Sequence, residues 1–442
     1  MINYPMCLKE KLILIVKEMA ASPAEFVKNP GKDFSRERKL TFETVINLLL
    51  SMGGNSIYKE LLEYFKYDIN TVSSSAFVQQ RSKILPFAFE YIFNQFTNSF
   101  DDFKTFNGYR LLAVDGSLLS IARNPNDSDS YISATNNNSE KGCNYLHLDA
   151  MYDLCNRLYI DASISPIKKQ NERRTLVDMI ERSKLENNVI IVADRGYENY
   201  NVFAHIEEKG WKYAIRVKDL KGKNCITSSL VLPSKDEFDY TINLKLTRKQ
   251  TNEIKAHPEI YKFLPNNVTF DYLSPDKESR NKFYPISFRV VRFKISEDSY
   301  ETIITNLSKE EFTPKMLKMI YHMRWGIETS FRELKYAIGL VNLHSKKVEL
   351  ISQEIFAKLT MYNFCEIITL HVVISQKKRK HNYQVNFTIA IHICKYFFKC
   401  YDEHPPNVEA LIQKNILPVR KDRQDHRKLR SKTTVSFIYR VA

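Results

Sequence analysis

The spacing of apolar residues predicts a helical region at the start of the chain. Residues 1–105 carry apolar side chains at three- to four-residue intervals and lack the alternation that is typical of strands. Helices are expected at 41–50 and 56–65, on either side of the turn residues 53–55, and a third is expected to begin near Ser74. Helix, glycine-containing turn and helix is the outline of a DNA-reading helix-turn-helix. A small helical bundle without that function has the same pattern.

From Tyr109 onward the pattern is that of an α/β fold. Short apolar runs predict strands, and a segment with helical periodicity lies between them. In chain order these elements are a strand at 111–114, a hairpin of 145–152 and 157–164, a helix at 171–184 and a strand at 189–193. Residues 217–300 contain β-like runs joined by Pro- and Asn-containing connections, which predicts an all-β insertion. A long apolar helix is expected at 352–374.

A further predicted helix carries an unusual polar face. Thr313 and Pro314 are helix-start residues, and Gly339 is a helix-stop residue. At about 100° per residue, four polar side chains of this helix fall within an arc of about 60°. They are Tyr321, Arg324, Glu328 and Lys335.

This polar stripe has two interpretations. It can be a solvated helix face stabilised by pairs such as Arg324 with Glu328, four residues apart. Alternatively, the carboxylate holds a divalent metal ion, and the flanking cations and phenol hold phosphate groups. The second interpretation needs further carboxylates from elsewhere in the chain.

Two aspartates that end apolar runs are candidates for these carboxylates. Asp115 follows the run at 111–114, and Asp194 follows the run at 189–193. The carboxyl end of a central strand is where ligands of open α/β sheets usually bind. Taken singly each signal is weak, because Asp also commonly begins turns.

Together, these residues resemble the DDE transposases of the insertion-sequence-four family. The spacing of Tyr321, Arg324, Glu328 and Lys335 matches the Tyr-Arg-Glu-Lys signature of that family, and Asp115 and Asp194 resemble its first two acidic residues. The resemblance covers roughly residues 109–340. It implies an α/β, ribonuclease-H-like catalytic core, interrupted by the β-rich insertion and preceded by an α-helical DNA-binding domain. The expected domains are 1–105, the core at 106–216 with 301–375, the insertion at 217–300, and a basic C-terminal region at 376–442.

The resemblance also implies a reaction and its site. Two Mg²⁺ or Mn²⁺ ions would support in-line displacement at phosphorus during excision and strand transfer, with Asp115 as the bridging ligand and Asp194 and Glu328 each completing one ion site. The partners would be double-stranded DNA, as terminal inverted repeats and as target, and a second copy of the chain. The expected DNA contacts are Tyr321, Arg324, Lys335, Arg332 and Arg195. In the best-understood relatives a tryptophan of the insertion stabilises a flipped base, but this chain has only Trp211 and Trp325.

Composition and charge agree with a nucleic-acid partner. The chain has 66 Lys and Arg against 51 Asp and Glu, a net charge of +15, and residues 420–432 are especially basic. Its seven cysteines form no Cys-x-x-Cys pair, which favours free thiols in a reducing cytoplasm. No run approaches the length of a membrane span.

Two alternatives remain open from the sequence. A metal-dependent nuclease or resolvase on the same fold would cut DNA without joining a 3′ end to a target. A DNA-binding protein derived from a transposase would not cut at all.

Three further aspartates lie in or beside the predicted hairpin, but Asp153 fits a turn position and Asp161 a solvent-facing strand position, and Asp149 carries no distinct signal.

Overall fold

The computed structural model describes residues 4–133, 142–220, 225–276, 281–297, 299–372, 382–400 and 405–419. The basic segment at 420–432 therefore lies outside the described residues, as does much of the C-terminal region that begins at 376. None of the described helices is long and apolar enough to cross a membrane.

The N-terminal region is helical, as predicted. Its helices are α1 (Tyr4–Ala21), α2 (Phe42–Ser51), α3 (Ile57–Tyr64), α4 (Ser74–Arg81) and α5 (Phe87–Thr97). The predicted cap at the start of α2 is present, because the side chain of Thr41 accepts a hydrogen bond from the backbone N–H of Thr44. This arrangement does not by itself distinguish a DNA reader from a helical bundle.

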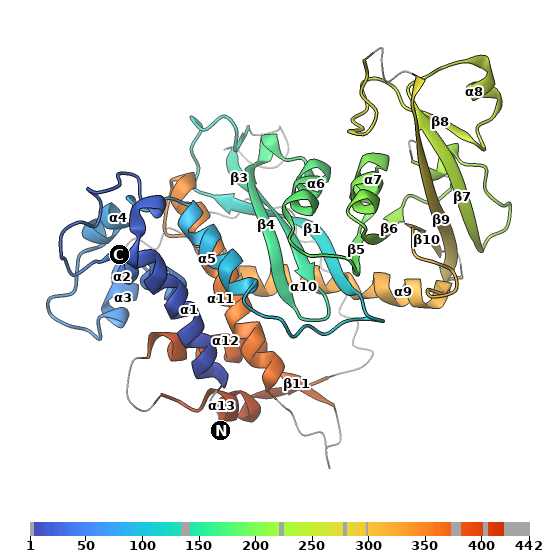
Figure 1. The fold of residues 1–442 in the computed structure, drawn as a ribbon. Helices are drawn as coiled ribbons and strands as arrows, with labels where there is room; N and C mark the ends of the chain where they lie inside the picture. Colours follow the sequence, from blue (N-terminus) through green and yellow to red (C-terminus); the bar gives the residue numbers. More distant parts are fainter. Residues whose placement is uncertain are drawn as a thin grey trace.

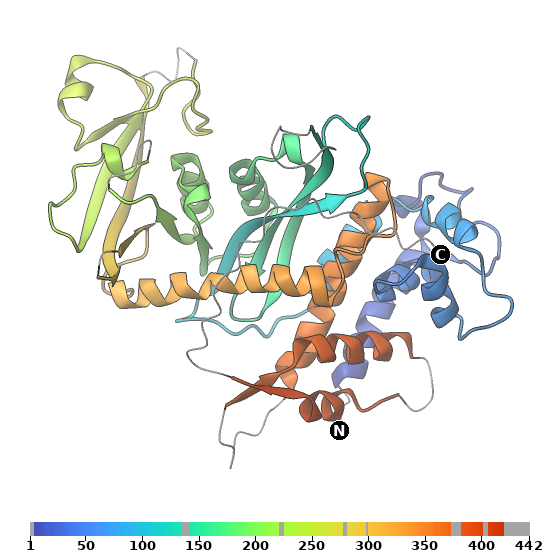
Figure 2. The same ribbon diagram turned by 180° about the vertical axis from the view of Figure 1, so that it is seen from behind.

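These helices share one hydrophobic core with the C-terminal helices. Side chains of α1, α2 and α5 pack together with those of α11 (Val348–His371), α12 (Phe387–Lys399) and α13 (Val408–Lys414). Figures 1 and 2 show the N-terminal helices and the described C-terminal helices together in one helical lobe. A buried ion pair between Arg81 of α4 and Glu354 of α11, 2.9 Å apart, joins the two sets of helices.

The central part is a mixed sheet in the predicted order of strand, strand, strand, helix, strand. The elements are β1 (Arg110–Ile121), β3 (Cys143–Asp153), β4 (Leu158–Pro166), α6 (Glu172–Arg182), β5 (Val189–Ala193), α7 (Tyr200–Glu208) and β6 (Lys212–Val217), with the short β2 (Tyr131–Ile132) at one edge. Strand β1 lies between β3, which is antiparallel to it, and β5, which is parallel. Helices α6 and α7 cover one face of the sheet (Figure 1).

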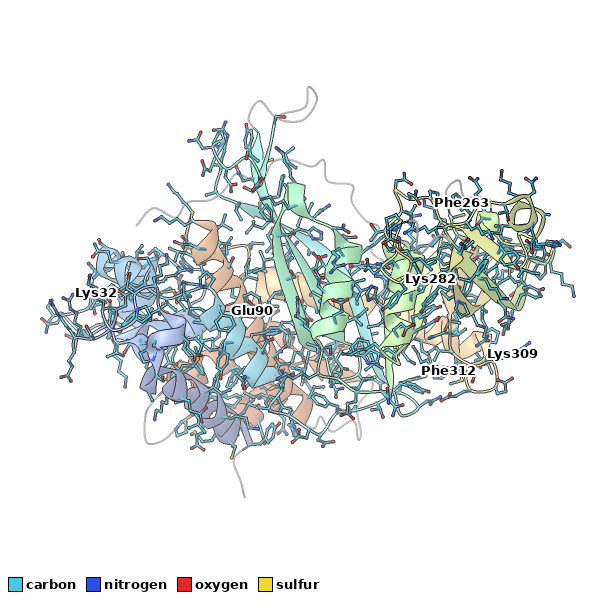
Figure 3. All side chains as sticks on the ribbon, turned by 45° about the horizontal axis from the view of Figure 1, so that its top comes forward. Lys32, Glu90, Phe263, Lys282, Lys309 and Phe312 are labelled. Carbon is cyan, nitrogen blue, oxygen red and sulfur yellow. The ribbon has the colours of Figure 1, made fainter. Side chains whose placement is uncertain are left out.

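The predicted insertion continues this sheet instead of forming a separate one. It contains β7 (Phe238–Thr247), α8 (Asn252–Ala256), β8 (Tyr261–Phe263) and β9 (Phe283–Ser296). Strand β9 pairs with β10 (Ser299–Thr305), which pairs with β6 of the core. Its regular elements are mainly strands, but α8 is a helix. The prediction of an all-β insertion is therefore wrong, and the segment is better described as β-rich. In Figure 3, Phe263 of the insertion and Lys32 of the helical lobe lie at opposite ends of the molecule.

The polar helix begins and ends where predicted but is not one regular helix. It comprises α9 (Pro314–Met323), α10 (Trp325–Arg332) and a π-helical turn at Glu333–Ala337. Arg324 interrupts the hydrogen-bond pattern while keeping a helical conformation (φ −50°, ψ −33°), so the chain still follows one path across the sheet (Figure 2). Thr313 caps the start, and Gly339, with a φ of +93°, follows the end.

Candidate active site

Strands β1 and β5 bring Asp115 and Asp194 together. The two strands are parallel neighbours, and their pairing ends with Val114 opposite Ala193. Asp115 follows Val114, and Asp194 follows Ala193. Their backbones are therefore about 5 Å apart, the usual distance between paired strands. The two aspartates are therefore neighbours, as predicted. Only β5 ends at its aspartate, however, because β1 continues past Asp115 to Ile121 in its pairing with β3.

Helix α10 adds Glu328, and Arg324 connects it to Asp115. The Arg324 guanidinium donates a hydrogen bond from Nη2 to Glu328 Oε1 at 2.8 Å, and its Nη1 lies 3.9 Å from Asp115 Oδ2. The pair that the solvated-face interpretation proposed therefore forms, but it is not a surface pair. The side chain of Arg324 is only 2% exposed, while Asp115 and Glu328 are 27% and 34% exposed.

Asp194 joins the same network through Arg216 of β6. Arg216 Nη2 lies 2.9 Å from Asp194 Oδ1, and its Nη1 lies 3.4 Å from Glu301 Oε1. The ring of Tyr321 connects the two arginines, because its centroid is 5.6 Å from the Arg216 guanidinium carbon and 5.5 Å from that of Arg324. The sequence did not predict Arg216, whose only signal is a cation inside an apolar strand.

The electrostatics of this site favour a bound cation. Burial is the main reason that the pKa of Asp115 is raised to about 6. The charges of Glu328 and Glu172 act in the same direction, and the hydrogen bond from the Gly116 N–H and the charge of Arg324 act against it. Carboxylates that disfavour ionisation in this way are stabilised by an added positive charge. All three candidate ligands offer carboxylate oxygens, the donor type that Mg²⁺ and Mn²⁺ prefer, so the residues present fit such ions.

We predict that Asp115→Asn stabilises the protein at pH 7 in the presence of a chelator. The raised pKa means that the charged form of Asp115 opposes folding, and this cost grows as the pH rises from about 4 through 6. Removing the charge should increase the free energy of unfolding by about 1–2 kcal/mol at pH 7 and change it little at pH 4. Denaturant unfolding at the two pH values measures this. A parent protein that is the more stable of the two at pH 7 would contradict it.

The predicted DNA contacts differ in their exposure. Arg195 and Arg332 are exposed, whereas Tyr321 and Arg324 are almost fully buried. Lys335 is partly exposed and donates from Nζ to the carbonyl oxygen of Leu118 at 2.8 Å. Arg195 and Arg332 are therefore accessible to a ligand as they stand, and DNA contact by all five residues stays a prediction.

Other predicted residues have structural roles. Asp153 accepts backbone hydrogen bonds from Cys155 and Asn156, which confirms its turn position. Asp161 pairs with Arg182 at 2.7 Å, and its side chain is only 18% exposed, so its assignment to a solvent-facing position is wrong.

The two tryptophans also differ. Trp211 is 1% exposed and donates from Nε1 to the carbonyl of Glu186, so it is a core residue. It is therefore not available to take the place of the relatives' base-stabilising tryptophan. Trp325, by contrast, is 50% exposed at the start of α10.

A second group of polar residues adjoins the site and was not predicted. His147, Asp149 and Glu172 place one potential metal-ligand atom each within 4.8 Å of one another. No local pattern reveals this group, because it forms only when α6, which begins at Glu172, packs on β3, which carries His147 and Asp149.

Comparisons with known proteins place this geometry in context. A family model described as the transposase DDE domain matches residues 106–364, more than half of the chain. Among solved structures, the chain is similar to the piggyBac transposase in a synaptic complex with hairpin DNA. The sequence identity is 10% and the TM-score 0.48, over 94% of this chain and 87% of the other. A search of curated proteins gives no match.

Proposed function

The chain belongs to the transposase DDE domain family, and on this premise we propose that it cuts DNA at the ends of an insertion sequence and transfers the 3′ ends into target DNA. The observation that carries the proposal is the convergence of Asp115 and Glu328 on Arg324, with Asp194 on the strand beside Asp115. Within the family, the Tyr-Arg-Glu-Lys spacing at 321–335 supports membership of the insertion-sequence-four group. The strand order of the sheet supports a ribonuclease-H-like core.

Asp115, Asp194 and Glu328 would hold two Mg²⁺ or Mn²⁺ ions. Bound ions of this kind activate an attacking oxygen and stabilise the leaving oxygen at phosphorus. Asp115, which is the neighbour of Asp194 and lies close to Arg324, the partner of Glu328, is the candidate for the ligand that both ions would share. Arg324 lies close to Asp115 and Glu328, and Arg216 pairs with Asp194, so the two guanidinium groups offset part of the negative charge of the three carboxylates.

DNA would contact the exposed cations around this site. Arg195 follows Asp194 directly, and Arg332 lies one helical turn beyond Glu328. A guanidinium binds phosphate through two parallel hydrogen bonds, which orients the backbone as well as attracting it. Lys335, Tyr321 and Arg324 complete the proposed set of contacts at the DNA end.

The remaining assignments rest on sequence and family. Helices α2 to α4 are the candidate reader of the terminal inverted repeats, and the basic residues at 420–432 would add contacts to phosphate that do not depend on DNA sequence. We propose a homodimer that holds two element ends and acts in the cytoplasm. The proposed domain boundaries are those expected from the sequence.

Cutting itself is tested with a duplex that carries the terminal repeat found beside the coding region. Incubation with Mg²⁺ or Mn²⁺ should nick this duplex at the element end, and a chelator should prevent it. Absence of nicking with either ion would leave only the non-catalytic DNA-binding alternative.

We predict that Arg332→Ala weakens binding of the same duplex about tenfold or more. Loss of a hydrogen bond to a charged group costs about 1.5–3 kcal/mol, and the side chain is exposed, so the fold should be unaffected. Lys309→Ala is the matched control, because Lys309 is an exposed cation before the start of α9 (Figure 3). Titration by gel shift at fixed salt compares the two. Equal affinity losses for both variants would mean that only net charge matters.

A further inference from the structure

His147, Asp149 and Glu172 form a compact charged group on the face of the sheet that α6 covers. His147 Nδ1 lies 3.1 Å from Asp149 Oδ2, and its Nε2 lies 3.3 Å from Glu172 Oε1. His147 and Asp149 are 4% and 1% exposed, while the side chain of Glu172 is 36% exposed. The imidazole therefore lies between two carboxylates, one of them in the interior.

This group packs directly on the backbone that follows Asp115. Gly116 stands opposite Asp149 in the β1–β3 pairing. A Cβ atom at Gly116 would lie 2.3 Å from His147 Cε1 and 2.9 Å from Glu172 Oε1, closer than non-bonded atoms approach. Glycine at this position is what allows the imidazole and Glu172 to lie against β1.

The same group reaches the backbone that follows Asp194. A Cβ atom at Gly196 would lie 3.4 Å from Glu172 Oε2, an ordinary contact distance. The carboxylate of Glu172 therefore lies close to the residue after Asp115 and to the second residue after Asp194. One side chain is thus next to both segments that carry the proposed ligands.

The contacts fit an imidazolium better than a metal ion. Both ring nitrogens are within hydrogen-bond distance of a carboxylate, so a doubly protonated ring satisfies both and leaves neither nitrogen free for a metal. Burial lowers the pKa of His147, but its hydrogen bonds to Asp149 and Glu172 outweigh this and raise the pKa to about 9. Asp149 Oδ1 and the Tyr197 hydroxyl are buried without a hydrogen-bond partner among the described residues.

We propose that His147, Asp149 and Glu172 act as a positioning unit that holds the backbone beside Asp115 in β1 and the backbone that follows β5, so that Asp115 and Asp194 bind metal ions together. This inference rests on the proposed function of the three carboxylates. The unit does not touch DNA or the reacting atoms. The unit acts on the arrangement of Asp115 and Asp194, because Glu172 and His147 pack close to the backbone next to these two ligands.

The chain offers a matched control for this proposal. His205 of α7 is also buried, at 7% exposed, and also lies between two carboxylates, with Nε2 2.7 Å from Asp271 and Nδ1 3.3 Å from Glu181. No contact joins it to Asp115, Asp194 or Glu328 among the described ion pairs. His205→Gln therefore reproduces the loss of a buried imidazole without disturbing the proposed unit.

The test measures the Mn²⁺ concentration that gives half-maximal nicking of the terminal-repeat duplex. His147→Gln should raise it about tenfold or more, the usual size of effect when groups that orient metal ligands are removed, with a smaller change in the rate at saturating Mn²⁺. His205→Gln should leave it unchanged. Glu172→Gln, which alters a partly exposed side chain, should shift it in the same direction and serves if the His147 variant does not fold. No shift in the Glu172 variant, or an equal shift in the His205 variant, overturns the proposal.

Two controls separate this inference from its premise. If Asp115→Asn abolishes nicking while His147→Gln and Glu172→Gln cut with the parent's Mn²⁺ requirement, only the positioning unit is wrong. If Asp115→Asn nicks the duplex at the parental rate, the proposed function itself is wrong, and the positioning unit loses its premise. A triple variant, Asp115→Asn, Asp194→Asn and Glu328→Gln, lacks the proposed metal ligands, so calorimetry should detect no Mn²⁺ bound to it. If this variant does bind one Mn²⁺ ion and loses it when His147→Gln is added, the unit is a metal site and the positioning role is overturned.

Discussion

Glu328→Gln should abolish nicking of the terminal-repeat duplex while leaving its binding within about twofold of the parent. The substitution keeps the shape of the side chain and removes the charge that would hold a metal ion. Arg324 can still donate to the amide oxygen, so the α9–α10 path should persist. The paired measurement is a gel shift and a nicking assay on one duplex across a Mg²⁺ series.

Glu333→Gln is the control for this prediction. Glu333 lies on the same helical path but accepts a hydrogen bond from Tyr362 and lies 3.8 Å from Arg157, away from the three proposed ligands. It should cut near the parental rate. Nicking by Glu328→Gln at the parental rate would show that the polar face around Glu328 is not the active site.

Arg81→Ala should destabilise the protein by about 3–5 kcal/mol, the largest effect expected of a substitution outside the active site. Arg81 and Glu354 are 1% and 2% exposed, and removal of Arg81 leaves the buried carboxylate of Glu354 with His344 but without its arginine counter-ion. Arg81 also donates from Nε to Gln353 at 2.9 Å, so the contact between α4 and α11 loses more than the ion pair. Unfolding in urea, followed by helical circular dichroism, should show a lower midpoint.

Lys28→Ala tests whether the burial of the Arg81–Glu354 pair is the reason for the large loss of stability expected of Arg81→Ala. Lys28 and Glu349 also join the N-terminal region to α11, at 2.8 Å, but their side chains are 35% and 39% exposed. A pair exposed to this extent contributes about 0–1 kcal/mol. Similar losses for both variants would contradict the view that the two ends of the chain are joined mainly through their shared core.

The boundaries of the polar helix and the end of β5 could be predicted because their signals are local. A Pro at position 314, a Gly at 339 and an apolar run that stops at Asp194 each act through neighbouring residues. The prediction that a strand ends at Asp115 is wrong, because β1 continues to Ile121 in its pairing with β3. The stripe prediction assumed a regular helix, which the break at Arg324 and the π-helical turn do not maintain. Lys335 accordingly reaches the carbonyl of Leu118 instead of lying free beside Glu328.

The features that the sequence did not reveal depend on contacts between distant segments. Arg216 is recognisable as part of the site only once β6 is known to lie beside β5. His147 is recognisable as part of a charged group only once Glu172, on helix α6, is known to lie beside it. The pairing of β10 with β6, which attaches the insertion to the core sheet, likewise has no local signature.

Joining of DNA ends tests the central claim most directly. A terminal-repeat duplex with a free 3′-hydroxyl at the cut end, mixed with the protein, Mg²⁺ and a circular target plasmid, should become covalently attached to the plasmid. Asp115→Asn, Asp194→Asn and Glu328→Gln should each prevent the attachment. Metal-dependent nicking without any attached product would contradict the account and identify the protein as a nuclease on the same fold.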